Sequence, residues 1–114
     1  MSKMNKRIKQ LWVAALRSGE YAKGKGALRA NGKFCCLGVL CNLHAQEHPK
    51  FASKQTQKNL YGGKSELPPI AVYEWAKLDD YIRVNIDGNL SKLEVHNDNG
   101  VSFKKIAKAI EEQL

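Results

Sequence analysis

The sequence predicts a small α+β domain, and three observations lead to that class. The first is a dense apolar stretch, Phe34 to Cys41, in which Gly38 is the one residue without an apolar side chain. The second is helical spacing of apolar residues near both ends of the chain. The third is a set of two-residue turn signals typical of β-hairpins. At 114 residues the chain has the length of a single domain, residues 1–114.

The apolar stretch is predicted to be the central helix of the domain. Asn31-Gly32 is the preferred two-residue hairpin turn, so residues 27–30 and 33–35 are expected to pair as strands. After this hairpin, apolar residues recur at helical spacing, which predicts a helix from Cys36 to about Gln46. Because glycine costs about 1 kcal/mol in a helix interior, Gly38 indicates a close approach by another element.

The N-terminal part of the chain predicts an amphipathic helix followed by a loop. Asn5 is expected to cap a helix that runs to about Arg17, and Gly19 is expected to end it in a left-handed conformation. Residues 21–26 then form a loop rich in glycine and lysine. The apolar stripe of the helix is predicted to comprise Ile8, Leu11, Trp12, Ala15 and Leu16.

The C-terminal half predicts shorter elements. Residues 47–67 are polar and are expected to lack regular structure, with Leu60-Tyr61 as their anchor. Pro68-Pro69 is expected to open a short helix with Ile70, Tyr73, Trp75 and Ala76 facing inward. Polar and apolar residues alternate over residues 81–87, as in a half-buried strand, and Asp87-Gly88 is expected to form a turn. Residues 90–96 are ambiguous between a return strand and a helix capped by Ser91. Asn97 to Gly100 predicts a turn, after which Ser102 is expected to cap a final helix whose inward residues are Phe103, Ile106, Ala107 and Ile110. The prediction is therefore about four helices around a central cysteine-rich helix, with one or two β-hairpins.

Charge and cysteine content narrow the functional classes. Residues 1–33 carry nine Lys or Arg and one acid, Glu20, whereas residues 34–114 carry ten of each, so the net charge of +8 lies entirely before Phe34. This asymmetry favours an anionic partner or, equally, a solubilising surface.

Three cysteines, two of them adjacent, form a poor disulfide framework, so free buried thiols are expected. With no apolar segment of membrane-spanning length and no signal peptide, the chain is expected to be cytoplasmic.

The order of motifs resembles a family of small uncharacterised proteins of tailed phages and prophages. The matching pieces are Trp12 to Tyr21, Gly26 to Arg29, Phe34 to Cys41, Leu67-Pro68, Trp75-Ala76, Asn97-Asp98, Ser102-Phe103, Ile106-Ala107 and Ile110-Glu111. The resemblance implies an accessory phage function in the host cytoplasm, such as blocking host defence. Where that family has Gly-Leu after the Trp-Ala pair, this chain has Lys77-Leu78.

Basic and aromatic residues between positions 17 and 29 form the predicted ligand-binding surface. Arginine and lysine neutralise phosphates, and tyrosine stacks on a nucleobase. The surface comprises Arg17, Tyr21, Lys23, Lys25 and Arg29. The segment Lys23-Gly24-Lys25-Gly26 also offers backbone N–H groups to a phosphate, although it lacks the spacing of a nucleotide-triphosphatase loop.

The cysteines and histidines suggest two further kinds of site, and each has a purely structural role as its alternative. Cys35 or Cys36 near a helix N-terminus, with His96 as base and Asn97 or Asp98 as orienter, would make a cysteine nucleophile. A metal site would use Cys36, Cys41, His44 and His48, but their spacing is unusual for zinc. Core packing is the favoured role for the thiols.

The leading functional hypothesis is a non-enzymatic phage accessory protein that sequesters a nucleotide-type small molecule in counter-defence, without a cofactor or a metal. The alternative is an inhibitor module that binds nucleic acid or an acidic protein surface, and a second alternative is a cysteine-dependent hydrolase. No membrane partner is expected, and the sequence leaves open whether the protein forms homo-oligomers.

Overall fold

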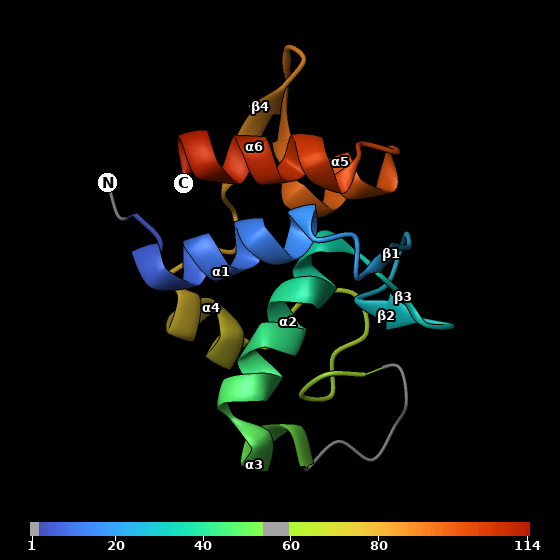
Figure 1. Cartoon of the computed structure of the whole chain (residues 1–114), viewed down its shortest axis with the longest axis vertical. Helices are drawn as coiled ribbons and strands as arrows, with labels where there is room; N and C mark the ends of the chain where they lie inside the picture. Colours follow the sequence, from blue (N-terminus) through green and yellow to red (C-terminus); the bar gives the residue numbers. More distant parts are fainter. Residues whose placement is uncertain (1–2, 54–59) are drawn as a thin grey trace.

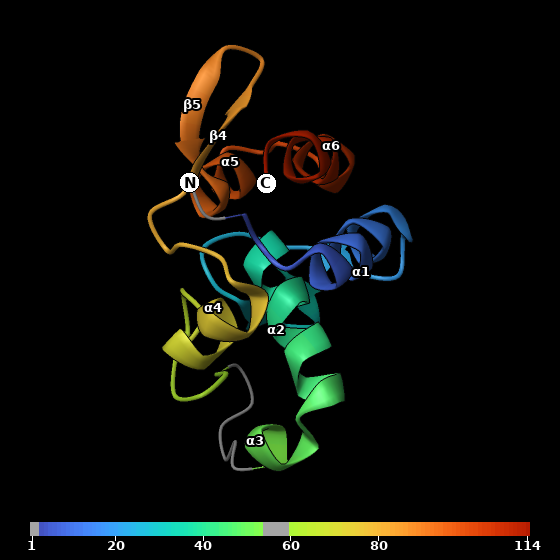
Figure 2. The ribbon, with the colours of Figure 1, turned by 90° about the vertical axis from the view of Figure 1, so that its left-hand side faces the viewer.

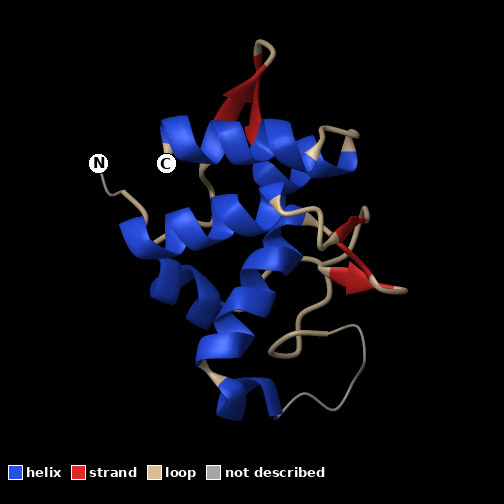
Figure 3. Cartoon of the chain, in the orientation of Figure 1, coloured by secondary structure: helices blue, strands red, loops and turns tan. Residues whose placement is uncertain are grey.

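Groups of helices and groups of short strands follow one another along the chain (Figures 1 and 3), and the computed structural model describes residues 3–53 and 60–114. The helices among these residues are α1 (Lys6–Arg17), α2 (Cys36–Glu47), α3 (Pro49–Ser53), α4 (Ile70–Ala76), α5 (Leu93–Asp98) and α6 (Phe103–Gln113). The strands are β1 (Ala22–Lys23), β2 (Arg29–Ala30), β3 (Lys33–Phe34), β4 (Arg83–Ile86) and β5 (Asn89–Lys92). The α+β prediction is confirmed, with two small sheets, one of which is a hairpin.

Helix α2 is the centre of the fold, as predicted. It contacts α1, α3, α4 and α5, and the other helices surround it in two perpendicular views (Figures 1 and 2). Its first six residues, 36–41, are all buried. Trp12 of α1 is fully buried against it and donates from Nε1 to the carbonyl oxygen of Cys36 at 2.9 Å. Trp12 is therefore a core residue.

Helix α1 has the predicted ends and a slightly rotated inner face. The Asn5 side chain accepts from the Ile8 N–H at 3.0 Å, and Gly19 has a φ of 79°. Leu11, predicted to face inward, is 40% exposed, whereas Val13 is buried. The rotation arises because α1 packs against both α2 and α6, so its buried stripe is centred between these two neighbours.

The hairpin prediction at Asn31-Gly32 is confirmed, and a third strand joins it. β2 and β3 pair antiparallel, and both turn residues have positive φ, 54° and 76°. β1 pairs parallel with β3, giving the order β1-β3-β2. The expectation that all of residues 21–26 form a loop is therefore wrong. A strand of two residues carries too little periodicity to be recognised in the sequence.

Residues 47–67 are partly regular, contrary to expectation, because α3 forms directly after α2. The predicted anchor at Tyr61 is confirmed: its hydroxyl lies 2.6 Å from Nδ1 of His44 in α2. The prediction for residues 54–59 falls outside the described residues.

Helix α4 opens after Pro68-Pro69 as predicted, but Ile70 is 74% exposed rather than inward. Val72 and Ala76, four residues apart, form the buried face. Ile70 lies two residues before Val72, about 200° around the helix, and so points to the opposite side. The helix ends at Ala76, and the next residue, Lys77, has a left-handed φ of 54°.

The C-terminal third forms a hairpin and two helices. Val84 and Ile86 of β4 are buried while Arg83 and Asn85 are exposed, which confirms the predicted alternation. The ambiguous residues 90–96 contain both structures, since β5 is followed directly by α5, and Ser91 does not cap that helix. The Ser102 side chain caps α6, whose predicted inward residues are all buried. The hairpin projects beyond α6 in Figures 1 and 2.

Among the described helices, none combines the length and the apolar character that crossing a membrane requires.

Candidate functional site

A buried polar junction joins the Lys23–Gly26 loop to the start of α2 and the end of α5. Asn97 is fully buried and lies at its centre. Its Oδ1 accepts from the Cys36 N–H at 3.1 Å, and its Nδ2 donates to the Gly24 carbonyl at 2.8 Å. Its own carbonyl accepts from Lys23 Nζ at 2.7 Å. One asparagine thus positions both the basic loop and the N-terminus of α2.

The glycine-rich loop does not present an open anion nest. The Gly24 N–H donates to the Phe34 carbonyl at 2.7 Å, as β1 continues beside β3. The Gly26 N–H donates to Asp98 Oδ1 at 2.9 Å, so a carboxylate of the chain itself occupies the position that a bound anion would take. Any anion held by this segment would therefore be bound by side chains.

Three of the five predicted ligand-binding residues share one face of the β1-β3-β2 sheet. Lys23 and Arg29 both pair with Phe34, so these three side chains form one row across the sheet. Tyr21 lies two residues before Lys23, and its ring meets that of Phe34 edge-on at 5.0 Å. Lys33 lies in the neighbouring row, on the opposite face.

The other two predicted residues have different surroundings. Lys25 is exposed in the loop after β1. Arg17, at the end of α1, forms a solvent-exposed ion pair with Glu111 of α6 at 3.1 Å. Arg17 is therefore paired between two helices rather than placed in the row on the sheet.

The surroundings of Lys23 disfavour its charged form and lower its pKa. Partial burial lowers the pKa of its ammonium group, and the positive charge of Lys25 lowers it further, while Asp98 opposes both effects. The ammonium group of a lysine has three N–H donors, and one of them bonds to the Asn97 carbonyl. The other two can donate to a bound anion.

The three cysteines are buried and form no disulfide. Burial raises the pKa of all three thiols. Cys35 caps α2 by accepting from the Gly38 N–H at 3.3 Å, and the Cys36 thiol donates to the Leu93 carbonyl at 3.7 Å. Protonated thiols in these positions fill space and cap a helix.

The residues weighed for a cysteine nucleophile are directed away from one another. His96 Nε2 lies 2.8 Å from the Val84 carbonyl of β4, and because a carbonyl only accepts, this nitrogen donates. Asn97 and Asp98 hold the basic loop instead of a histidine. The geometry therefore gives no thiol–imidazole pair among these residues.

Two of the residues considered for a metal site, His44 and His48, make aromatic contacts instead. His44 Nδ1 contacts the Tyr61 hydroxyl, and the His44 ring stacks on His48 with 4.4 Å between centroids. Over residues 3–53 and 60–114, no three or more His, Cys, Asp and Glu side chains are grouped to hold a metal ion.

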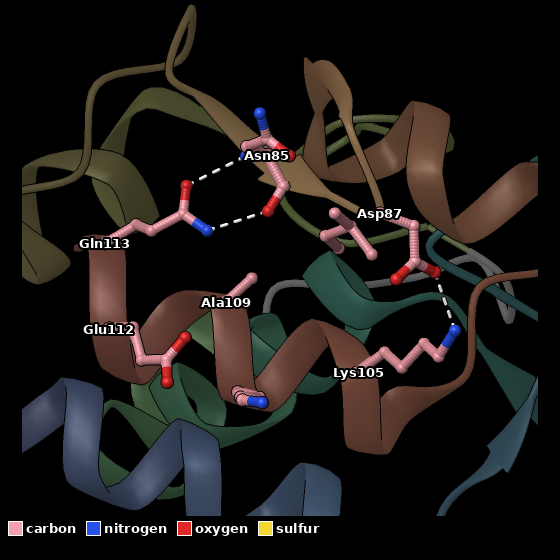
Figure 4. A pocket seen from close by; sticks show the side chains of 8 residues that line it. Asn85, Asp87, Lys105, Ala109, Glu112 and Gln113 are labelled. Atoms are coloured by element: carbon pink, nitrogen blue, oxygen red, sulfur yellow. Dashed lines mark hydrogen bonds and ion pairs between the residues drawn. The ribbon is translucent and has the colours of Figure 1, made fainter.

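A hollow of about 240 Å³ between β4 and α6 has its polar groups largely paired (Figure 4). Gln113 accepts from the Asn85 N–H and donates to the Asn85 carbonyl, both at 2.8 Å. Lys105 pairs with Asp87 at 2.6 Å. The Gln113 amide thus covers the outer edge of β4 as a neighbouring strand would, which makes this hollow structural.

Sequence reasoning missed the role of Asn97. It was assigned to a turn and to a catalytic set, whereas it is the second-last residue of α5 and a buried clamp. Asparagine is common in turns, so nothing in the local pattern distinguishes a buried amide. The acidic residues that flank the junction, Glu66, Glu94 and Asp98, were likewise missed as a group, because they come together only in the folded chain.

The fold and the junction define a small α+β domain in which Asn97 and Asp98 hold the basic loop against the start of α2. The chain belongs to the family described as "Domain of unknown function (DUF8296)", which matches residues 4–114. No curated protein and no solved structure matches the chain.

Proposed function

We propose that this protein is a non-enzymatic binding protein that captures an anionic, nucleotide-type small molecule on the sheet face carrying Tyr21, Lys23 and Arg29. The observation that carries the proposal is the register of the sheet, which sets Lys23 and Arg29 on either side of Phe34. Two cations flanking an aromatic ring provide charge for a phosphate and an apolar surface for a base.

The expected affinity follows from the number of contacts. Charge-assisted hydrogen bonds contribute about 1.5–3 kcal/mol each, and stacking of a base on an aromatic ring about 1–3 kcal/mol. Two such bonds and one stacked base give roughly micromolar binding after ordering costs. An anion between Lys23 and Lys25 would also relieve their mutual repulsion. The resemblance to phage proteins supports sequestration of a host signalling nucleotide as the biological role.

A pair of charge reversals on opposite faces of the same sheet tests this proposal. Arg29→Glu changes the proposed face, and Lys33→Glu makes the same change of charge on the other face. Native mass spectrometry and calorimetry against a panel of nucleotides should show binding lost in Arg29→Glu and retained in Lys33→Glu. Circular dichroism of both variants checks that the sheet is intact, and Arg29→Gln gives a milder change at the same position.

Equal loss in both variants would contradict a face-specific site. It would instead support the alternative, an inhibitor module that contacts nucleic acid through diffuse charge, which the net charge of +8 before Phe34 favours. That alternative predicts a steep decrease of affinity for DNA or RNA with salt. Intact ligand recovered in stoichiometric amount supports sequestration, whereas turnover of excess ligand would make the protein an enzyme.

A further inference from the structure

Two adjoining hollows form a groove on the surface beside α4 and α5. One, of about 340 Å³, is lined by Gly26, Ala27, Cys35, Glu66, Leu67, Glu94 and Asp98. The other, of about 610 Å³, extends along residues 63–68 and past α4 to Lys92. Glu66 and Leu67 line both hollows, so the two lie side by side.

The groove is acidic although the protein is basic. Glu66, Asp80, Glu94 and Asp98 line it, against two lysines, Lys64 and Lys92. Among the described residues, the ion pairs join Arg7 to Glu47, Arg17 to Glu111 and Lys105 to Asp87, and none of them uses a carboxylate of the groove. Asp98 also accepts from the Gly26 N–H, but none of these ion pairs neutralises the groove carboxylates, so their negative charge is available to a partner.

The carboxylates of the groove contribute to a raised pKa at two neutral side chains in its walls, Tyr73 and Cys35. Burial raises the pKa of the Tyr73 hydroxyl, and the charges of Glu94 and Asp80 raise it further. Burial likewise raises the pKa of the Cys35 thiol, with added contributions from Asp98 and Glu94. Carboxylates of the groove thus act on a side chain in each hollow.

The groove also carries exposed apolar side chains. Ile70 is 74% exposed and Leu67 is 42% exposed, and both line the larger hollow beside the half-buried Tyr73. At this exposure Ile70 contributes little to the core. Apolar side chains next to carboxylates that take part in none of these ion pairs match a ligand that combines a cationic and an apolar group.

We propose that this groove docks an extended segment of a partner protein that carries a lysine or arginine close to an apolar residue. The cationic side chain enters the hollow between Glu66, Glu94 and Asp98, and the apolar side chain covers Leu67 and Ile70. A nucleotide would be repelled by these carboxylates, so this surface is distinct from the proposed nucleotide face and goes beyond that function.

The test uses a panel of fluorescein-labelled octapeptides that contain one arginine and one leucine at every spacing in a glycine-serine background. Fluorescence anisotropy should show binding for a narrow range of spacings, and replacing the arginine by glutamate should abolish it. Ile70→Asp and Glu66→Lys should each weaken binding by about tenfold or more. Leu90→Asp and Glu112→Lys, which change exposed residues of the same kinds elsewhere, should leave affinity within about twofold.

Several outcomes would overturn the proposal. These are the absence of binding across the panel, equal binding of the glutamate peptides, and equal effects of the groove and control variants. Binding of free arginine amide as tightly as the best peptide would show a small-cation site instead. Dimerisation in sedimentation that is lost in Ile70→Asp would assign the groove to a second copy of the chain. None of these measurements depends on nucleotide binding, so the two proposals can fail separately.

Discussion

Gly38 lies directly against the backbone of Leu28: a Cβ atom on Gly38 would be 1.8 Å from the Leu28 carbonyl oxygen. That carbonyl also accepts from the Cys35 N–H at 3.2 Å, and the Leu28 N–H donates to Ser65 at 2.7 Å. The central helix and the strand region before it are therefore in contact through backbone at a point where glycine alone fits. The expectation that Gly38 marks a close approach is confirmed.

Gly38→Ala should be strongly destabilising. Helix propensity favours alanine by about 1 kcal/mol, but the added methyl overlaps backbone atoms that are fixed by hydrogen bonds. We expect a net loss of about 3 kcal/mol or more in the free energy of unfolding, measured by urea denaturation. Ala45→Gly in the same helix is the control, with a loss of about 1 kcal/mol. A Gly38→Ala protein as stable as the wild type would refute the close contact.

Asn97→Leu should destabilise the protein by leaving one buried and one partly buried backbone group without partners. The Cys36 N–H and the Gly24 carbonyl both bond to the Asn97 side chain. Each unsatisfied buried group costs about 1–3 kcal/mol, so a loss of about 2–6 kcal/mol is expected for the two groups. Hydrogen exchange at the Cys36 amide should accelerate in step with that loss. The neighbouring change Asn99→Leu, at an exposed position, serves as the control.

His44 should make stability depend on pH between about 6.5 and 4. Burial and the charge of His48 lower the pKa of His44 from 6.5 to about 4. In this window the unfolded chain binds a proton at His44 that the folded chain does not, so stability is full above pH 6.5 and decreases as the pH falls. The decrease attributable to His44 is at most about 3.4 kcal/mol. Denaturant titrations should show a weaker pH dependence in His44→Gln, and an unchanged slope would exclude His44 as its source.

The thiols should react slowly in the native protein. All three are buried, and burial raises the pKa of each, so little thiolate is present at neutral pH. Ellman's reagent should modify them on the order of 100-fold more slowly than in denaturant, because reaction requires opening of the core. Cys36→Ala should lower the free energy of unfolding by about 1–2 kcal/mol with ligand binding retained. A folded Cys35→Ser or Cys36→Ser protein without any binding would reverse this interpretation.

Lys77→Gly should be neutral or slightly stabilising. Lys77 ends α4 in the left-handed conformation, which costs an L-residue about 1 kcal/mol and glycine little. The greater freedom of glycine in the unfolded chain offsets part of this gain, so a change of about 0 to +1 kcal/mol is expected in thermal or urea unfolding. Ala71→Gly, inside the same helix, should instead be destabilising.

The sequence by itself determined the elements whose signals are local. Capping side chains at Asn5 and Ser102, the turn at Asn31-Gly32 and the alternation around Val84 each act within a few residues, and the structure has each as predicted. The density of apolar residues from Phe34 to Cys41 was enough to predict that α2 lies at the centre of the fold. The binding face remains a prediction from the distribution of charge along the sequence. The register of the sheet brings Tyr21, Lys23 and Arg29 together on one face.

Tertiary structure alone decided the features that join distant segments. The two-residue strand β1 exists because β3 offers it a hydrogen-bonding edge, which no local propensity encodes. Ile70 faces solvent because the buried face of α4 was set by which side meets the core. Asn97 became a clamp because folding placed its amide within reach of Cys36 and Gly24, 61 and 73 residues away in the chain. Such contacts depend on the summed packing of the whole domain, whereas caps and turns depend on neighbours that the sequence displays directly.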